Sequence, residues 1–419
     1  MSKRIRANSN ILIIGGGIAG ISSAIYLGEQ GHKVTLVERE EKLGGRLNNL
    51  FSVYGMDICT KDFVSQQISK LNKSSNITVL TSTELVETKG YVGNFNSKLK
   101  IKNSKLREIK HGAVIIATGI DVSTPKMRCN SQGIINHTRL EDYIADSKIR
   151  RLSKVVFLCD FDKEDSQIIA LSTLKNALLL REKLRCEVFV ISRNIKVAGR
   201  KFEKLYTAAR EKGVVFIKSI DSLMKVSPCN DLISVELSST GSAVEGIDVR
   251  SLQLICDWLI IGESILPSQG TEELSEILGV ERDKQGFFQN NNVHFMPNLS
   301  NRKGIFFAGA CHIDAGLNDI LDDSLTAAYA AHNLVAKSTI EIDEKTAEVD
   351  EEKCALCLTC IRSCPHKAVD IDFSREASKK TAKIIEEACF GCGICTSLCP
   401  SRAIQLREYE DEKILELIG

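Results

Sequence analysis

The sequence has no apolar run that approaches the roughly 20 residues needed to span a bilayer. Its opening segment, MSKRIRANSN, leads into an apolar stretch without the hydrophobic region of a signal peptide. An excess of one charge is also missing, because 55 basic and 54 acidic residues give a formal net charge of +1. The basic residues form no stripe. We therefore expect a cytoplasmic protein with no direct membrane span and no nucleic-acid partner.

Close cysteine pairs are missing from most of the chain. Seven of the 15 cysteines are scattered singly through residues 1–353. A disulphide reductase relays two electrons through neighbouring thiols, so disulphide reduction by this chain alone is disfavoured. Unpaired thiols also indicate a reducing compartment.

The other eight cysteines form two runs of the pattern C-x2-C-x2-C-x3-C-P. This pattern is typical of bacterial ferredoxins with two clusters, in which the fourth cysteine of each run ligates the other cluster. We predict one [4Fe-4S] cluster on Cys354, Cys357, Cys360 and Cys399, and a second on Cys389, Cys392, Cys395 and Cys364. Paired zinc knuckles are the alternative, but the expected histidine or four-ligand groups are missing. Such clusters pass single electrons, so the sequence predicts electron transfer.

Residues 11–38 have the pattern of a dinucleotide-binding βαβ unit. The expected elements are a strand at Ile11–Ile14, a helix at Ile21–Glu29 and a strand at Val34–Val37. Between the first strand and the helix, Gly15 permits a tight turn, Gly17 lets the backbone approach a pyrophosphate, and Gly20 allows close helix packing. Glu38 is placed to bind a ribose diol. We predict a bound dinucleotide here.

Three further segments resemble recurring elements of flavoproteins with two dinucleotide-binding domains. They are Gly44-Gly45-Arg46, the strand Ala113–Gly119 that ends in Ala-Thr-Gly, and the strand Gly304–Gly309. This resemblance favours FAD over NAD. The residues expected to contact FAD are Gly15, Gly16, Gly17, Ile18, Ala19, Gly20, Glu38, Arg39, Gly45, Arg46, Val86, Ala117, Thr118, Gly119, Gly309, Cys311, Asn318, Asp319 and Ile320.

A second α/β segment follows, with a strand at Val155–Cys159, a helix through Ser166–Leu184 and a strand at Val188–Ile191. Its first turn, Asp160-Phe161-Asp162, lacks glycine, and two carboxylates would repel a pyrophosphate. We expect this domain to serve packing and partner contact without bound NAD.

The expected fold is α/β, a two-dinucleotide-binding-domain flavoprotein of Rossmann-like type followed by a small α+β two-cluster ferredoxin domain. Residues 1–150 and 291–337 would form the FAD domain and residues 151–290 the second domain. Residues 338–353 are polar and acid-rich, which indicates a linker, and residues 354–409 would form the ferredoxin domain.

Several stretches together resemble the A subunit of heterodisulfide reductase. They are Gly15–Gly20 with Gly44–Arg46, Gly90–Phe95, Lys201–Phe216, Pro267–Phe288, Gly304–Cys311, Asp319-Ile320 and Asp323-Ser324. The resemblance implies an oxidoreductase component, active within a complex, that passes electrons between FAD, two [4Fe-4S] clusters and partner subunits of a heterodisulfide-reductase-like assembly. It leaves homodimerisation open.

The chain also departs from that family. After Gly44-Gly45-Arg46 it has a single cysteine, Cys59, where relatives commonly have a cluster of cysteines. The ferredoxin insert after Gly90–Phe95 is absent, and Asn318 replaces a common lysine. The sequence therefore resembles a shortened member that keeps the C-terminal cluster pair, and flavin-based bifurcation is in doubt. Cys59 is either a redox thiol or, more often for a free cysteine, a small buried hydrophobe.

No residue is assigned a catalytic role. His312 and Asp314 suggest an acid/base pair, but no substrate pocket places them, and Cys311 could either contact the flavin or pack against a helix. One alternative function is a self-contained NAD(P)H:acceptor oxidoreductase resembling the small subunit of glutamate synthase. Another is a structural module with a vestigial flavin site, which the intact Gly15–Glu38 pattern disfavours.

Overall fold

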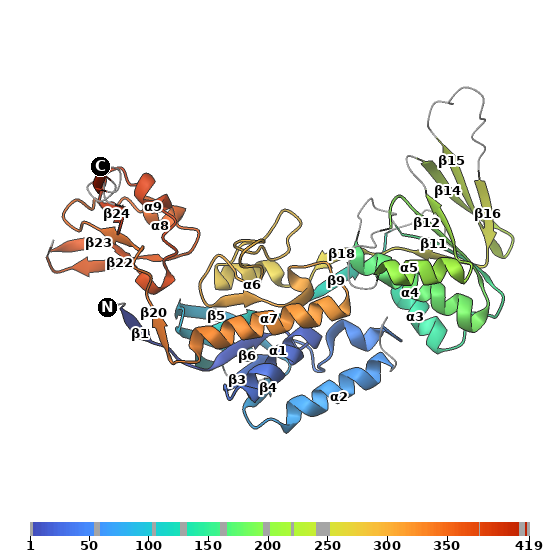
Figure 1. Ribbon diagram of the computed structural model, residues 1–419, viewed down its shortest axis with the longest axis horizontal. Helices are drawn as coiled ribbons and strands as arrows, with labels where there is room; N and C mark the ends of the chain where they lie inside the picture. The colour runs from blue at the N-terminus through green and yellow to red at the C-terminus, as the bar shows by residue number, and fades with distance from the viewer. Residues whose placement is uncertain are drawn as a thin grey trace.

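Three parts of the molecule follow one another along its longest axis (Figure 1). The computed structural model describes residues 3–53, 59–102, 106–125, 132–159, 166–195, 202–218, 222–239, 252–376, 378–409 and 415–416. A central body lies between a second α/β unit at one end and a cysteine-rich domain at the other (Figure 1). None of the helices in these ranges combines the length and apolar character that crossing a bilayer requires.

The body is built on a parallel sheet with strand order β19-β8-β2-β3-β4. Its strands are β2 (Ile11–Ile14), β3 (Val34–Val37), β4 (Ile77–Leu80), β8 (Ala113–Ile116) and β19 (Ile305–Phe307). The strands β2 and β8 are buried throughout, as expected of a parallel sheet covered on both faces. The two strands predicted at the start of the chain are confirmed with the predicted bounds.

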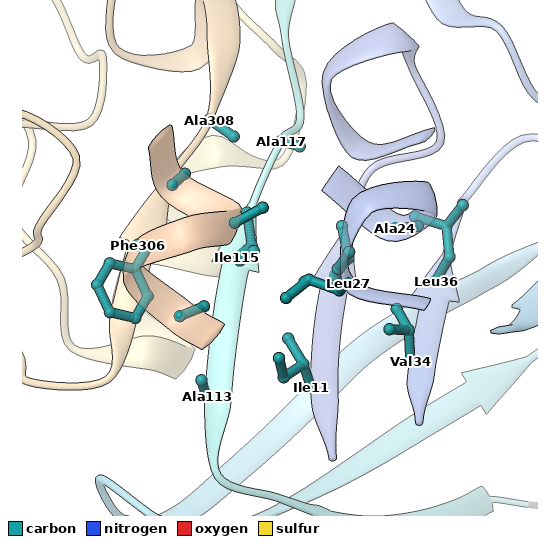
Figure 2. Packing of buried hydrophobic residues seen from close by; sticks show 14 of the residues in the cluster. Ile11, Ala24, Leu27, Val34, Leu36, Ala113, Ile115, Ala117, Phe306 and Ala308 are labelled. Atoms are coloured by element: carbon teal, nitrogen blue, oxygen red, sulfur yellow. The ribbon is translucent and has the colours of Figure 1, made fainter. Parts of the chain in front are cut away.

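Helices cover one face of this sheet. They are α1 (Ile18–Glu29), α2 (Thr60–Lys73) and α7 (Leu317–Val335). Figure 2 shows this core, in which Leu27 of α1 points toward Ile11 of β2 and Ile115 of β8. The other face packs against α6 (Thr271–Leu278) and an antiparallel sheet of β5 (Thr83–Tyr91), β6 (Asn94–Ile101) and β7 (Leu106–His111).

The second α/β unit has a parallel sheet with strand order β10-β17-β11-β12-β13. Its strands are β10 (Ile134–Asn136), β11 (Lys154–Leu158), β12 (Glu187–Ser192), β13 (Val215–Lys218) and β17 (Trp258–Ile261). Its helices are α3 (His137–Ala145), α4 (Gln167–Leu184) and α5 (Phe202–Glu211), and an antiparallel sheet adds β14 (Ser222–Cys229), β15 (Leu232–Ser239) and β16 (Leu252–Cys256). The predicted strand–helix–strand order is confirmed, while the Asp160–Asp162 turn lies outside the described residues.

The sheets divide the chain earlier than the predicted boundaries at 150/151 and 290/291. The strand β10 already belongs to the second sheet, and α6 with Phe288 packs in the core of the body. The strands β9 (Ile120–Ser123) and β18 (Ser264–Pro267) pair antiparallel where the chain leaves the body and returns to it. We keep the division into two domains as a proposal, with its boundaries moved to these two strands.

The cysteine-rich domain has two short hairpin-like ladders and two short helices. Its elements are β21 (Ala347–Val349), β22 (Val369–Ser374), β23 (Lys379–Ile384), β24 (Ile404–Leu406), α8 (Thr359–Ser363) and α9 (Ile394–Ser397). Residues 338–353, expected to be an irregular linker, contain β21 and also β20 (Thr339–Glu341), which pairs with β1 (Arg4–Arg6). This connection is therefore tied to both neighbouring parts by backbone hydrogen bonds.

Candidate functional site

The glycine-rich turn after β2 lies at the carboxyl edge of the body sheet. Gly15 has a φ of +112°, and a Cβ atom built on it would lie 2.3 Å from the Ala117 carbonyl oxygen. A Cβ on Gly20 would lie 1.9 Å from the Gly15 carbonyl oxygen. At Gly17, by contrast, a Cβ would meet nothing within 4 Å. The outer glycines therefore allow tight packing, while the middle one leaves the open approach that a pyrophosphate needs.

The carboxylate of Glu38 closes the same turn from the end of β3. Its Oε2 atom accepts a hydrogen bond from the Gly16 amide at 2.6 Å, and its Oε1 atom accepts one from the Glu40 amide at 2.8 Å. An ionised carboxylate has about four acceptor sites, so lone pairs remain for a ribose diol. Glu38 is thus held in a fixed orientation beside the glycines.

Two neighbouring strand ends complete the candidate dinucleotide site. We call this site, formed by the turns after β2, β8 and β19 with Glu38, the cradle. After β8, Gly119 has a φ of +68° and faces open space, and the Thr118 hydroxyl is buried without a partner among the described residues. After β19, Gly309 has a φ of +74° and packs against Ala19 of α1. The helices α1 and α7 both begin without a side-chain cap, so their first amides are available to an anion. These features suit a dinucleotide such as FAD, which could bind the unpartnered hydroxyl, lie over the glycine and place its phosphates at the two helix N-termini.

Most of the predicted FAD contacts gather at this edge. Ile18 and Ala19 occupy the buried first turn of α1, and Gly45 packs against Gly17. The first turn of α7 carries Asn318, Asp319 and Ile320. These assignments to FAD stay predictions.

Four of the residues predicted to contact FAD make other contacts or lie elsewhere in the structure. The Arg39 guanidinium donates to the Gln269 carbonyl at 2.5 Å, and Val86 lies within β5. Cys311 is 2 % exposed, and its thiol donates to the Ile116 and Ala308 carbonyls, so burial raises its pKa to about 12. For Cys311 the structure favours packing. Arg46, the fourth, is described below.

His312 and Asp314, which suggested a pair in the sequence but were given no catalytic role, have different partners in the structure. Asp314 instead accepts hydrogen bonds from the Gln167 and Ile168 amides at 2.7 and 3.1 Å, at the start of α4. His312 Nε2 lies 3.0 Å from Oδ2 of Asp323, which the sequence pattern did not place in the site. Asp323 lies in the second turn of α7, and no local motif in the sequence marks that contact.

Buried charges join the body to the second unit. The Arg46 guanidinium lies 3.6 Å from the Glu263 carboxylate, and burial lowers the pKa of Arg46. The Lys175 ammonium pairs with Glu141 and donates to the Ser52 carbonyl at 2.8 Å. Sequence reasoning missed Glu141, Lys175 and Glu263, because they meet only after the chain has crossed between the two sheets.

Cys59 precedes the first turn of α2 and is half-buried. Its thiol donates to the Phe51 carbonyl at 3.6 Å. Residues 54–58, which come directly before it, lie outside the described residues.

Two cavities lie in the cysteine-rich domain, and each is bordered by four cysteines. The first is bordered by Cys364, Cys389, Cys392 and Cys395. The second is bordered by Cys354, Cys357, Cys360 and Cys399. Both quartets match the crossed ligand sets predicted from the spacing. Among the described residues, no three possible ligands come together as a site for a single metal ion.

The surroundings of these cysteines suit iron–sulphur clusters. Burial, together with the nearby Cys389 and Cys364 thiolates, raises the pKa of Cys395 to about 11. Four thiolates therefore need the positive charge of bound iron to stay ionised together. Backbone amides also point at the sulphurs, as between Ala403 and Cys399 at 3.2 Å and between Ala368 and Cys364 at 3.4 Å. Hydrogen bonds of this kind stabilise and tune clusters.

The first cavity faces the body. Asn301 donates from Nδ2 to the Pro365 carbonyl at 2.6 Å, and its own carbonyl accepts from His366 Nδ1 at 2.6 Å. Lys303 donates to the Cys389 carbonyl. Pro365, His366 and Cys389 all border the first cavity. We call the first cavity the body-side site and the second the outer site.

Two family models match separate parts of the chain. A family model described as pyridine nucleotide-disulphide oxidoreductase matches residues 9–333, and one described as a 4Fe-4S dicluster domain matches residues 347–406. The chain is 25% identical to the iron-sulfur A subunit of the CoB–CoM heterodisulfide reductase of Methanocaldococcus jannaschii, over 99% of this chain and 78% of that one. It is 23% identical to the A subunit of the H(2):CoB-CoM heterodisulfide,ferredoxin reductase of Methanothermobacter thermautotrophicus, over 88% of this chain and 71% of that one.

Solved structures share the fold over most of the chain. The thioredoxin reductase of Lactococcus lactis has a TM-score of 0.53 at 19% identity, covering 78% of this chain and 99% of that one. The thioredoxin reductase of T. acidophilum has a TM-score of 0.53 at 14% identity, covering 77% and 97%. The resemblance to the A subunit of heterodisulfide reductase and the predicted fold class are confirmed. The cofactors are FAD and two [4Fe-4S] clusters.

Proposed function

The chain belongs to the pyridine nucleotide-disulphide oxidoreductase family, and from that premise we propose that it is an electron-transfer subunit of a heterodisulfide-reductase-like complex. It passes electrons between FAD in the body, two [4Fe-4S] clusters in the cysteine-rich domain and partner subunits. FAD exchanges electrons in pairs, and each cluster carries one electron at a time. The relatives named above are the A subunits of such reductases, which supports a role beside partner chains.

The observation that carries this proposal is the attachment of the body-side site to the strand that leads to the flavin cradle. Asn301 and Lys303 hold the cysteine-rich domain, and β19 runs from them to Gly309 at the cradle. A two-electron carrier and a pair of one-electron carriers are thus built on one connected support.

The proposed FAD cradle and the cysteine-rich domain nevertheless lie apart. The start of α7, beside the cradle, faces the second unit, since a Cβ on Gly316 would lie 2.9 Å from the Leu171 side chain. The cysteine-rich domain lies at the opposite end of the body (Figure 1). The six residue steps from Lys303 to Gly309 span up to about 20 Å at roughly 3.3 Å per residue. Electron transfer slows steeply over such distances. We therefore propose that partner subunits exchange electrons with the flavin at one end and with the clusters at the other.

An anaerobic titration of the purified protein tests the proposal. We expect bound FAD, about eight irons per chain, and flavin bleaching by dithionite or an added partner but little by NADH or NADPH. Rapid bleaching by stoichiometric NADH or NADPH would contradict the proposal and support a self-contained oxidoreductase.

The setting and assembly are part of the same proposal. Because cluster ligands and single thiols need reducing conditions, we propose a cytoplasmic location. Co-purification of further chains under anaerobic conditions is expected, and the native mass of the isolated protein distinguishes a monomer from a homodimer.

A further inference from the structure

Each cysteine run begins with a cysteine whose backbone carbonyl accepts a hydrogen bond from a lysine. Lys379 donates to the Cys354 carbonyl at 2.9 Å, and Lys303 donates to the Cys389 carbonyl. Cys354 and Cys389 hold the same position in their runs. The two lysines, however, come from different parts of the molecule: Lys379 begins β23 inside the cysteine-rich domain, whereas Lys303 precedes β19 in the body.

The Lys303 side chain is half-buried beside an aromatic pair. Its ammonium lies 5.0 Å from the centroid of the Phe390 ring, which stacks on the His366 ring at 4.2 Å. Phe390 and His366 both border the body-side site. A positive charge from the body is therefore held close to the cysteines of the body-side site.

A charge in this position acts on cluster reduction. Reduction of a [4Fe-4S] cluster adds one electron and no proton, so its negative charge grows by one. Cluster potentials depend on net charge, hydrogen bonds and solvent exposure. A fixed cation stabilises the reduced form more than the oxidised form.

We propose that Lys303 raises the reduction potential of the body-side cluster, so that this cluster accepts an electron more readily than it would without its contact with the body. The proposal rests on the proposed function, because it requires both clusters in their cavities. Lys379 acts on the outer cluster in the same way, but from within the cysteine-rich domain. The body thus sets the potential of one cluster and leaves the other unchanged.

A potentiometric titration of the anaerobic full-length protein tests this. Dithionite with mediators supplies single electrons, and the electron paramagnetic resonance signal of the reduced clusters is followed against potential. In K303Q we expect the equilibrium constant for reduction of one of the two clusters to fall about tenfold, which lowers its reduction potential by about 59 mV. The potential of the other cluster should stay unchanged. In K379Q we expect the other couple to fall.

Three further variants sharpen the result. K303R keeps the charge and should restore the wild-type potential. K303M replaces the lysine with an uncharged side chain of similar length and should lower the same potential as K303Q. It provides the test if K303Q loses iron. K367Q removes an exposed lysine three residues after Cys364 and should shift either couple by less than about threefold, because water screens an exposed charge.

The proposal is overturned if K303Q or K303M, carrying full iron, leaves both couples in place or lowers both equally. A wild-type protein with far fewer than about eight irons is a different result, because it contradicts the proposed function itself.

Discussion

The Asp323 carboxylate accepts a hydrogen bond through Oδ2 from the backbone amide of Gly309 at 2.6 Å. The same oxygen lies 3.0 Å from His312 Nε2, and the other oxygen accepts from Asn298 Nδ2 at 2.8 Å. Gly309 has a left-handed conformation and packs on Ala19 in the first turn of α1. Asp323 therefore fixes one wall of the proposed FAD cradle from outside it.

Replacing Asp323 with asparagine should weaken FAD binding. The amide keeps the size but loses the charge that strengthens the bond to the Gly309 amide, which contributes about 1.5–3 kcal/mol for a charged group. We expect the dissociation constant for FAD to rise at least about tenfold, measured by titrating flavin into flavin-free protein. Asp322→Asn, an exposed neighbour on the same helix, is the matched control. Equal affinity in D323N and wild type would mean that the turn holds without the carboxylate.

Gly17 and Gly20 should respond differently to the same change. Gly17→Ala meets no protein atom within 4 Å and has a φ of −72°, so flavin-free protein should keep its thermal midpoint. Its added methyl group would instead occupy the approach to the pyrophosphate, so the protein should be isolated without flavin. In Gly20→Ala the methyl group would lie 1.9 Å from the Gly15 carbonyl oxygen, and we expect a loss of at least about 3 kcal/mol in stability.

Flavin absorbance and circular dichroism during heating measure both outcomes. A G17A protein that retains FAD would place the pyrophosphate elsewhere. A G20A protein as stable as wild type would show that the turn can move away from the helix.

The sequence predicted those elements whose signal is local. Ile11–Ile14 and Val34–Val37 are short, largely apolar runs, and a parallel sheet covered on both faces needs such strands. The cysteine spacing likewise predicted which four cysteines border each cavity.

Contacts between distant segments could not be predicted in this way. Glu263 and Arg46 look like ordinary surface charges in the sequence, yet the fold buries them at the join between two units. Lys303 is one lysine in a polar turn, and only the docked cysteine-rich domain gives it a partner in Cys389. His312 and Asp314 are close in the sequence, yet Asp314 binds the start of α4 instead, and nothing local in the sequence indicates that contact.

The buried pair of Lys175 and Glu141 should be far more sensitive to loss of one partner than of both. Their side chains are 10% and 2% exposed, and Glu141 also accepts the Phe51 amide at 3.1 Å. Lys175→Met leaves the carboxylate buried without its cation, which should cost about 3–5 kcal/mol. The double variant Lys175→Met with Glu141→Leu should recover part of that loss.

The only tryptophan, Trp258, reports on the second unit in this experiment. It lies in β17 of the second sheet and packs edge-on against Tyr143 of α3 at 5.6 Å. Urea unfolding followed by its fluorescence measures the stability of the second unit. A double variant less stable than K175M would contradict the expectation.

The stability of the second unit should fall below neutral pH through His137. This ring is fully buried against Phe157, and burial, helped by the nearby Lys175 charge, lowers its pKa to about 3. In the unfolded chain the pKa returns to its ordinary 6.5, so between pH 6.5 and 3 the unfolded state binds the extra proton. A lowered histidine pKa contributes stability above pH 6.5 that is lost as the pH falls. From pH 7 to pH 5 the loss should be about 2 kcal/mol.

His137→Gln removes the titrating group and should make the unfolding free energy less dependent on pH by that amount. The measurement is the urea midpoint of the Trp258 signal at pH 7, 6 and 5. His294→Gln is the control, because that imidazole is exposed and meets water in the folded and unfolded chain alike. If H137Q and wild type lose stability in parallel, the proton is taken up elsewhere and His137 stays accessible to solvent. If H137Q alone flattens the profile, the buried ring is the acid-sensitive group of this unit.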